Sequence, residues 1–226
     1  MKWFVDLFSS TLGRKLVMAL TGLFLISFLL IHLIGNLQLL KNDGGLAFNT
    51  YAEFMGHNPL IQTISKVNFG LILIHIIWSL LLTIKNRQAR GPQPYAVTGK
   101  SSIWSSRNMG ILGTFILIFL VVHLKDFYWQ QHFNEAMPRQ TYDGKEVKDL
   151  YTIVGFAFSQ AWYVILYVIC MIALAFHLFH GFGSAFQTLG LNHLKYNPII
   201  KVVGVAFSLI VPALFALIPI VMFFNK

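Results

Sequence analysis

The fold is decided first by one uncharged stretch, Leu16–Leu40, which reads LVMALTGLFLISFLLIHLIGNLQLL. A helix needs roughly 20 mostly apolar residues to cross a bilayer, and this stretch exceeds that length. Arg14 and Lys15 precede it, as basic residues precede the apolar part of a signal peptide. The stretch is nevertheless too long for a signal peptide and ends without a small-residue cleavage site. We therefore expect a membrane span that stays in the protein.

Four further apolar runs follow along the chain. Hydrophobic residues make up 56% of the 226 residues and charged residues 11%, whereas soluble domains carry about 25% charged residues. This composition excludes a soluble enzyme, a disordered chain and a small disulfide scaffold. We predict one transmembrane domain over residues 1–226, an all-α bundle whose five spans cover about 16–40, 60–84, 109–129, 154–182 and 199–224. Pro212 and Pro219 lie within the last span and are expected to kink it.

The loops carry their charge unevenly. The net charge is +9, and the whole excess of Lys and Arg lies in residues 1–15, 85–108 and 191–201. By the positive-inside rule these segments face the cytoplasm, which places the N-terminus inside and the C-terminus outside. The basic residues then lie at the cytoplasmic face of the membrane, where they can bind anionic lipid or a protein partner. Nucleic acid is not expected as a partner. No charged residue lies in the middle of a span, which argues against proton pumps and ion-coupled transporters.

Histidine is the polar residue of interest within the spans. A single buried histidine is usually structural, but here five lie within the first four spans: His32, His75, His123, and both His177 and His180 in the fourth. At about 1.5 Å of rise per residue, His32 and His123 lie roughly 24 and 22 Å from the inner ends of their spans. On the same measure, His75 and His177 lie roughly 14 and 9 Å from theirs. We therefore predict one pair toward the outer face and one toward the inner face.

Two imidazoles from facing helices at one depth are what a six-coordinate haem needs, since the porphyrin supplies the other four ligands. The predicted pairs are His32 with His123 for an outer haem and His75 with His177 for an inner haem. The sequence has no Cys-x-x-Cys-His motif, so both haems are expected to be non-covalent b haems. It also lacks the motifs of zinc proteases, nucleophile-elbow hydrolases and P-loop proteins.

Several neighbours of these histidines have more than one interpretation. His180 follows His177 by about one helical turn, and it could replace that ligand, bond a haem propionate or lie at the interface. Propionates could also bind residues near the inner face that are otherwise ordinary interfacial residues: Arg14, Lys15, Trp104, Ser105 and Arg107. Room for the macrocycles could come from glycines that otherwise serve close helix packing: Gly35, Gly70, Gly110, Gly113, Gly181 and Gly183.

Three motifs give the chain a family resemblance. They are Thr21–Phe24 leading to His32–Asn36, then Ser105–Gly110 opening the third span, and Ala175–Gly190 (AFHLFHGFGSAFQTLG) closing the fourth. Together they resemble the cytochrome b membrane anchor of succinate:quinone oxidoreductases. The match is to the single-subunit, five-helix, two-haem class of bacterial succinate dehydrogenases and fumarate reductases. The resemblance covers essentially the whole chain, and the fourth-span segment is its most specific part.

The resemblance implies four haem ligands, which fall on His32, His75, His123 and His177, with His177 rather than His180 as the ligand. It also implies cytoplasmic flavoprotein and iron–sulfur subunits, a quinone substrate that is usually menaquinone, and the bacterial cytoplasmic membrane. A dimer of such complexes is a further expectation. Succinate is oxidised in the flavoprotein of that family, so we expect no succinate-oxidising site in this chain.

Glu53 matches a carboxylate that is associated with quinone near the outer haem in some members of the family. Its ordinary interpretation is a solvated loop acid. Some relatives also carry a glutamate two residues before the fourth-helix ligand, where this chain has Ala175. A proton path through that helix is therefore in doubt.

Two other functions are compatible with the sequence. Cytochrome b anchors of hydrogenases, formate dehydrogenases and nitrate reductases are also His-rich helical proteins, although their histidines are placed differently. A small-molecule transporter or structural membrane protein with incidental histidines would bind no haem. The direction of the reaction, succinate oxidation or fumarate reduction, stays open because both use the same machinery.

Overall fold

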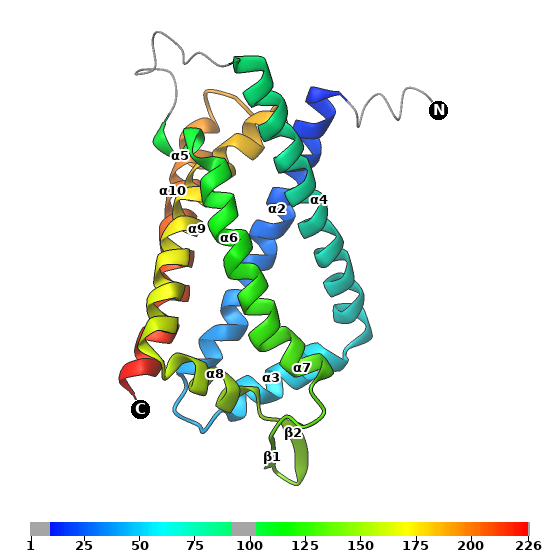
Figure 1. Ribbon diagram of the computed structural model, residues 1–226, viewed down its shortest axis with the longest axis vertical. Coiled ribbons are helices and arrows are strands. Elements are labelled where there is room, and N and C mark those ends of the chain that lie inside the picture. Colours follow the sequence, from blue (N-terminus) through cyan, green and yellow to red (C-terminus); the bar gives the residue numbers. More distant parts are fainter. Residues whose placement is uncertain (1–9, 92–102, 226) are drawn as a thin grey trace.

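The computed structural model describes residues 10–91 and 103–225, and it shows a chain that is almost entirely helical (Figure 1). Among these residues, five helices are long and apolar enough to cross a membrane: Thr11–Leu40, Pro59–Ala89, Met109–Phe133, Ala161–Thr188 and Asn197–Phe224. The predicted all-α class with five candidate spans is therefore confirmed, and the helices indicate a multi-pass membrane protein. Parts of the basic segments 1–15 and 85–108 lie outside the described residues.

Two of the spans combine several helical elements. The first is α2 (Thr11–Asn36) followed by the 3-10 turn η1 (Leu37–Leu40), and the third joins α6 (Met109–His123), the π-turn η2 (Leu124–Tyr128) and α7 (Trp129–Phe133). The others are α4 (Pro59–Arg90), α9 (Ala161–Thr188) and α10 (Asn197–Phe224). The connections hold α3 (Leu46–His57), α5 (Trp104–Arg107), α8 (Leu150–Phe158) and a hairpin of β1 (Arg139–Tyr142) and β2 (Lys145–Lys148).

Polar side chains fix where the first two spans begin, because they accept hydrogen bonds from otherwise unpaired N–H groups. Ser10 Oγ accepts from the Gly13 N–H at 3.0 Å at the start of α2. Asn58 Oδ1 accepts from the Leu60 N–H at 3.0 Å at the start of α4. Pro59 occupies the first turn of α4, where no N–H donor is needed. Both spans thus start at polar residues just outside their apolar runs.

The spans form a bundle around α9. Helix α10 packs along α9, and α2 and α6 also contact α9, whereas α4 packs mainly against α2 (Figure 1). Gly204 permits the close approach of α10, because a Cβ atom there would lie 2.7 Å from Phe182 Cδ1. The start of α2 and the end of α10 lie at opposite ends of the bundle.

The two ends of the bundle differ in content. We name the end with α3, α7, α8 and the hairpin the outer end, and the end with α5 and the α9–α10 connection the inner end. These names follow the predicted orientation, which stays a prediction. The main apolar core lies in the outer half and consists of these buried residues: Leu33, Leu39, Phe48, Phe127, Met137, Leu150, Val154, Phe158, Tyr163, Val164, Tyr167, Val211 and Ile218.

A buried polar cluster joins the outer connections to each other. Asn49 is completely buried, and its Nδ2 donates to Asp149 Oδ1 at 2.9 Å and to the Tyr142 hydroxyl at 3.1 Å. Its Oδ1 accepts from the Tyr151 N–H at 2.8 Å. Asp149 in turn accepts from the Thr152 N–H at 3.1 Å and caps α8. These bonds tie α3, the hairpin and α8 into one unit at the outer end.

The structure corrects two details of the outer end. The apolar run 154–182 was expected to be one span, but α8 ends at Phe158 and α9 begins at Ala161, with extended backbone at Gln160 between them. Hydropathy alone hides this break because both sides of it are apolar. The hairpin was not expected either, although Asp143 and Gly144, both with positive φ (49° and 79°), form its turn. Helix α10 continues through Pro212 and Pro219, and its kink stays a prediction.

Candidate functional site: two histidine pairs

The outer pair joins α2 to the end of α6. The His32 and His123 rings lie 5.7 Å apart between centroids, at an interplanar angle of 84°. Phe28 stacks on His32 at 5.2 Å, and Phe119 stacks on His123 at 5.5 Å. The π-turn η2 starts directly after His123, and such turns are frequent at functional sites. Packed aromatic rings therefore hold the outer pair in place.

The inner pair joins α4 to α9. The His75 and His177 rings lie 6.4 Å apart between centroids, at an interplanar angle of 61°. The His75 ring also lies close to α2, since a Cβ atom at Gly22 would be 3.5 Å from His75 Cε1. The four histidines that the depth estimate grouped are thus brought together as the two predicted pairs. Their role as ligands stays a prediction.

One histidine of each pair is held by a hydroxyl group that the sequence reasoning missed. His75 Nδ1 lies 3.0 Å from Thr21 Oγ1, and His123 Nδ1 lies 3.1 Å from the Tyr167 hydroxyl. Thr21 belongs to the Thr21–Phe24 motif, so that motif could have pointed to it. Tyr167 carries no such signal, because it is one of many aromatic residues in an apolar run.

The geometry of the pairs fits a metal held between two imidazoles. With the metal about 2 Å from each coordinating nitrogen, the ring centroids on opposite sides of it are about 6 Å apart. Within residues 10–91 and 103–225, no group of three or more His, Cys, Asp or Glu side chains gathers as a metal cage. Two ligands alone suit a metal whose remaining ligands come from a macrocycle, as in haem.

Unpaired polar atoms near the inner pair support the same fit. His177 Nδ1 and Trp78 Nε1 are buried without a hydrogen-bond partner among the described residues. Trp78 follows His75 by three residues on α4, and therefore lies on a neighbouring position of the same helical face. Buried polar groups are normally paired. A bound group with polar substituents would give these atoms partners.

The glycines that were expected to make room for macrocycles differ in their surroundings. A Cβ atom at Gly70, Gly113, Gly181 or Gly183 would meet nothing within 4 Å. A Cβ atom at Gly35 would overlap the Tyr51 ring, so this glycine accommodates a side chain of α3. Burial there raises the pKa of the Tyr51 hydroxyl. The Gly110 position is in ordinary contact with Thr83, at 3.7 Å.

Some of the predicted propionate partners lie close to the inner pair. Trp104 of α5 packs on Phe176 with ring centroids 5.3 Å apart, next to His177 in α9. Ser105 is buried, while Lys15 and Arg107 are exposed and Arg14 is half-buried. His180 is half-buried, and it is His177 whose ring faces His75. The ring contact favours His177 over His180 as the partner of His75.

Glu53, the predicted quinone residue, lies on α3 at the outer end. Its side chain is 19% exposed, and its carboxylate lies 3.4 Å from His57 Nδ1. Glu53 is thus more buried than a solvated loop acid. On the same helix, the ideal Cβ position of Gly56 is 3.9 Å from Gln131 Nε2 of α7, and Gln131 Oε1 is buried without a partner in the part of the chain that the structure describes. The outer end therefore holds an unpaired buried polar atom on α7, which faces Gly56 of the helix that carries Glu53.

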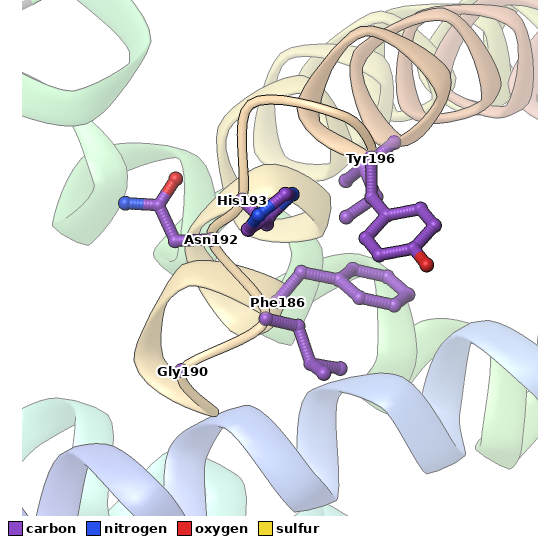
Figure 2. A pocket seen from close by; sticks show the side chains of 7 residues that line it. Phe186, Gly190, Asn192, His193 and Tyr196 are labelled. Carbon is purple, nitrogen blue, oxygen red and sulfur yellow. The ribbon is translucent and has the colours of Figure 1, made fainter.

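A pocket lies at the inner end (Figure 2). It is an open, mostly apolar hollow of about 450 Å³ between the end of α9 and the start of α10. Its lining residues are Phe186, Gly190, Leu191, Asn192, His193, Tyr196 and Ile200. None of the predicted site residues lines it, and it takes no part in the two histidine pairs.

Comparisons of the chain with protein-family models, with curated proteins and with solved structures found no match. The structure by itself defines a candidate multi-pass membrane protein with two facing histidine pairs. The relation to succinate:quinone oxidoreductases therefore stays a prediction from the sequence motifs.

Proposed function

We propose that this chain is the di-haem cytochrome b anchor of a succinate:quinone oxidoreductase in the bacterial cytoplasmic membrane. It transfers electrons between an iron–sulfur subunit on the cytoplasmic side and quinone, usually menaquinone, in the membrane. A flavoprotein subunit carries the succinate-oxidising or fumarate-reducing site. The proposal combines the facing histidine pairs with the sequence motifs.

The observation that carries the proposal is the spacing of the two pairs. His32 faces His123 at 5.7 Å and His75 faces His177 at 6.4 Å, both near the separation of about 6 Å that two axial imidazoles need. An incidental histidine on one helix has no reason to face a second one on another helix. Two such pairs at two levels of one bundle favour a function that uses both.

The residues of this chain have distinct tasks in such a protein. Bound haem b at each pair supplies a one-electron carrier. The four imidazoles fix where these carriers lie, and apolar helices keep water away from them. Neutral imidazole is suited to this environment, because no ionised group has to be buried. Aromatic rings position the outer pair, whereas Thr21 and Gly22 position the inner one.

The two ends of the chain suit different partners. Basic residues concentrate in the segments predicted to face the cytoplasm, where they can bind an iron–sulfur subunit and anionic lipid headgroups. At the outer end, Glu53 and the unpaired Gln131 Oε1 offer polar contacts for a quinone headgroup. Electrons thus cross the bundle between an inner protein partner and an outer quinone site.

The test is purification of the chain with its native partners in mild detergent, followed by haem extraction, visible spectra and a redox titration. We expect two protohaems per chain, two distinguishable midpoints, and copurified flavoprotein and iron–sulfur subunits with succinate:quinone activity. A preparation without protohaem would show the proposal to be wrong. Haem accompanied by subunits of a hydrogenase or formate dehydrogenase would replace the succinate partner and retain the di-haem anchor.

A further inference from the structure

We infer that the hollow between the end of α9 and the start of α10 binds an anionic phospholipid from the membrane leaflet at the inner end of the bundle. An acyl chain of the lipid lies against the apolar lining, and the phosphate binds beside Lys195 and His193. This inference goes beyond the proposed function and does not rest on the two histidine pairs, because none of the paired histidines lines the hollow.

One wall of the hollow forms where the sequence ends α9. Gly190 has a positive φ of 77°, and its N–H donates to the Gln187 carbonyl at 3.1 Å. The Leu191 N–H donates to the Phe186 carbonyl at 3.0 Å. These two bonds form a Schellman motif, in which a glycine follows the last helical turn and the residues on either side of the bend carry apolar side chains. Phe186 and Leu191 thereby become part of one lining.

Hydrogen bonds within the connection hold the other wall in place. The Tyr196 and Asn197 N–H groups both donate to the His193 carbonyl at 2.9 Å, and Asn197 Nδ2 donates to Asn192 Oδ1 at 2.7 Å. The His193 and Tyr196 rings lie with centroids 5.7 Å apart, and Figure 2 shows both around the hollow together with Phe186. The lining therefore has a defined shape before a ligand binds, which favours binding.

Apolar side chains near the hollow are strongly exposed. Leu191 is 54% exposed and Leu194 is 90% exposed, and Tyr196 and Ile199 are exposed as well. They lie in the connection between two candidate spans or in the first turn of the second one, at the level where hydrocarbon meets the lipid headgroups. Tyrosine is typical of this level. Neighbouring apolar side chains that are this exposed mark a membrane or ligand contact, so lipid is the expected neighbour of this surface.

The charged groups of the connection are basic. Lys195 Nζ lies 5.7 Å from the centroid of the Tyr196 ring, and its charge is therefore next to the lining. The Lys195 N–H donates to His193 Nδ1 at 3.1 Å. In the neutral His193 ring the hydrogen is then on Nε2, which can donate to a phosphate oxygen. Residues 189–201 contain two lysines, Lys195 and Lys201, and no Asp or Glu. A phosphate would thus meet no carboxylate of this connection.

An anionic phospholipid has both properties that this surface requires. The hollow has a volume of about 450 Å³, which lies within the usual range of about 300–1,000 Å³ for small-molecule sites. Phe186 and Ile200 line it from within the two candidate spans, where an acyl chain has access from the side of the bundle. A soluble subunit would approach from the aqueous side instead. A neutral lipid would match the lining but would leave the lysine without a counter-charge.

The experiment is a titration of the purified full chain, with its native partners, in mild detergent with dioleoyl phosphatidylglycerol, followed by native mass spectrometry. Dioleoyl phosphatidylcholine is the comparison without net charge. We expect saturable binding with a preference for phosphatidylglycerol. Lys195→Gln should weaken the binding of phosphatidylglycerol about fivefold, the factor that one lysine near an anionic membrane surface contributes. It should hardly change the binding of phosphatidylcholine.

Two further variants separate the apolar part of the site from its charge. Leu191→Asn should weaken the binding of both lipids, because the acyl chain loses apolar contact area. Lys85→Gln is the matched control, since it removes the same charge from the inner end. Lys85 belongs to α4, and its Nζ donates to Thr11 Oγ1 at 2.8 Å. This control should leave both affinities unchanged.

Three results would overturn the inference. The first is equal affinity of the wild type and Lys195→Gln for phosphatidylglycerol, and the second is an equal loss of affinity in Lys85→Gln. The third is loss of a copurified subunit in Lys195→Gln or Leu194→Asn with lipid binding unchanged, because a protein partner would then cover the hollow. Haem content is measured separately on the same samples, so each of these results leaves the proposed function intact.

Discussion

The outer and inner halves of the bundle are built differently around their histidine pairs. The outer pair lies among packed aromatic rings, and the outer half also contains the main apolar core and the Asn49 cluster. The inner pair has glycine and threonine beside it, and open space at Gly181 and Gly183. It also leaves His177 Nδ1 without a partner among the described residues.

This difference indicates which half of the bundle would depend more on a bound group for its stability. Close packing stabilises a fold without any ligand, whereas open space does not. We therefore expect substitutions in the outer half to act mainly on folding stability. Substitutions in the inner half should act mainly on haem content.

The largest effect is expected for His177→Ala. This change removes one proposed ligand of the proposed inner haem, so the haem-to-protein ratio should fall by about half, with the outer haem retained. Pyridine haemochrome assay of the purified protein measures the ratio. His180→Ala is the matched control on the same helix and should keep both haems. Loss of the inner haem in His180→Ala instead would reverse the choice between these two histidines.

A partial loss of the inner haem is expected for Gly22→Leu. The Cβ atom would already be in contact with His75 Cε1 at 3.5 Å, and the remaining side-chain atoms would push the His75 ring from its position. The same haem assay should show reduced inner haem and unchanged outer haem. Gly155→Leu, where a Cβ atom meets nothing within 4 Å, should keep both. Equal haem content in the two variants would argue against a ligand role for His75.

Gly45→Ala tests the outer half. Gly45 has φ of 87°, and a Cβ atom there would lie 2.5 Å from Tyr151 Cγ. Strain and overpacking together should destabilise the fold by about 2–4 kcal/mol, measured as a lower unfolding midpoint in detergent. Gly44 also has a positive φ, of 64°, but there is open space at its Cβ position. Gly44→Ala should therefore lower the free energy of unfolding by only about 1–2 kcal/mol. Similar midpoints for the two variants would contradict the tight contact with Tyr151.

The smallest effect is expected for Asp149→Asn. The amide keeps one acceptor oxygen but weakens the bonds from Asn49 and Thr152, which should cost about 1–2 kcal/mol of unfolding free energy. Thermal unfolding in detergent measures the change, and both haems should stay bound. Asp143→Asn, in the exposed hairpin turn, is the control and should leave the midpoint unchanged. A loss of haem in Asp149→Asn would mean that the outer cluster also supports the site.

The number and approximate bounds of the spans could be predicted, because a membrane-spanning helix is recognised in a sequence by its length and its hydropathy. The five runs were located to within several residues, except that the fourth run concealed the break between Phe158 and Ala161. Depth counting grouped the histidines because each helix rises by a constant amount per residue. This estimate does not depend on how the helices pack. The rings that face each other in the structure, His32 with His123 and His75 with His177, are the predicted pairs.

Contacts between distant residues were beyond such counting. Nothing in the pattern distinguishes Tyr167 from the other aromatic residues of α9, and Gly35 looked like room for a cofactor until Tyr51 was seen to fill it. The sequence by itself determined the all-α class, the number of candidate membrane spans and the grouping of the four histidines into two pairs, because these follow from local hydropathy and helical rise. Only the tertiary structure decided which hydroxyl holds which imidazole and where space is left, because those depend on how each helix is rotated against its neighbours.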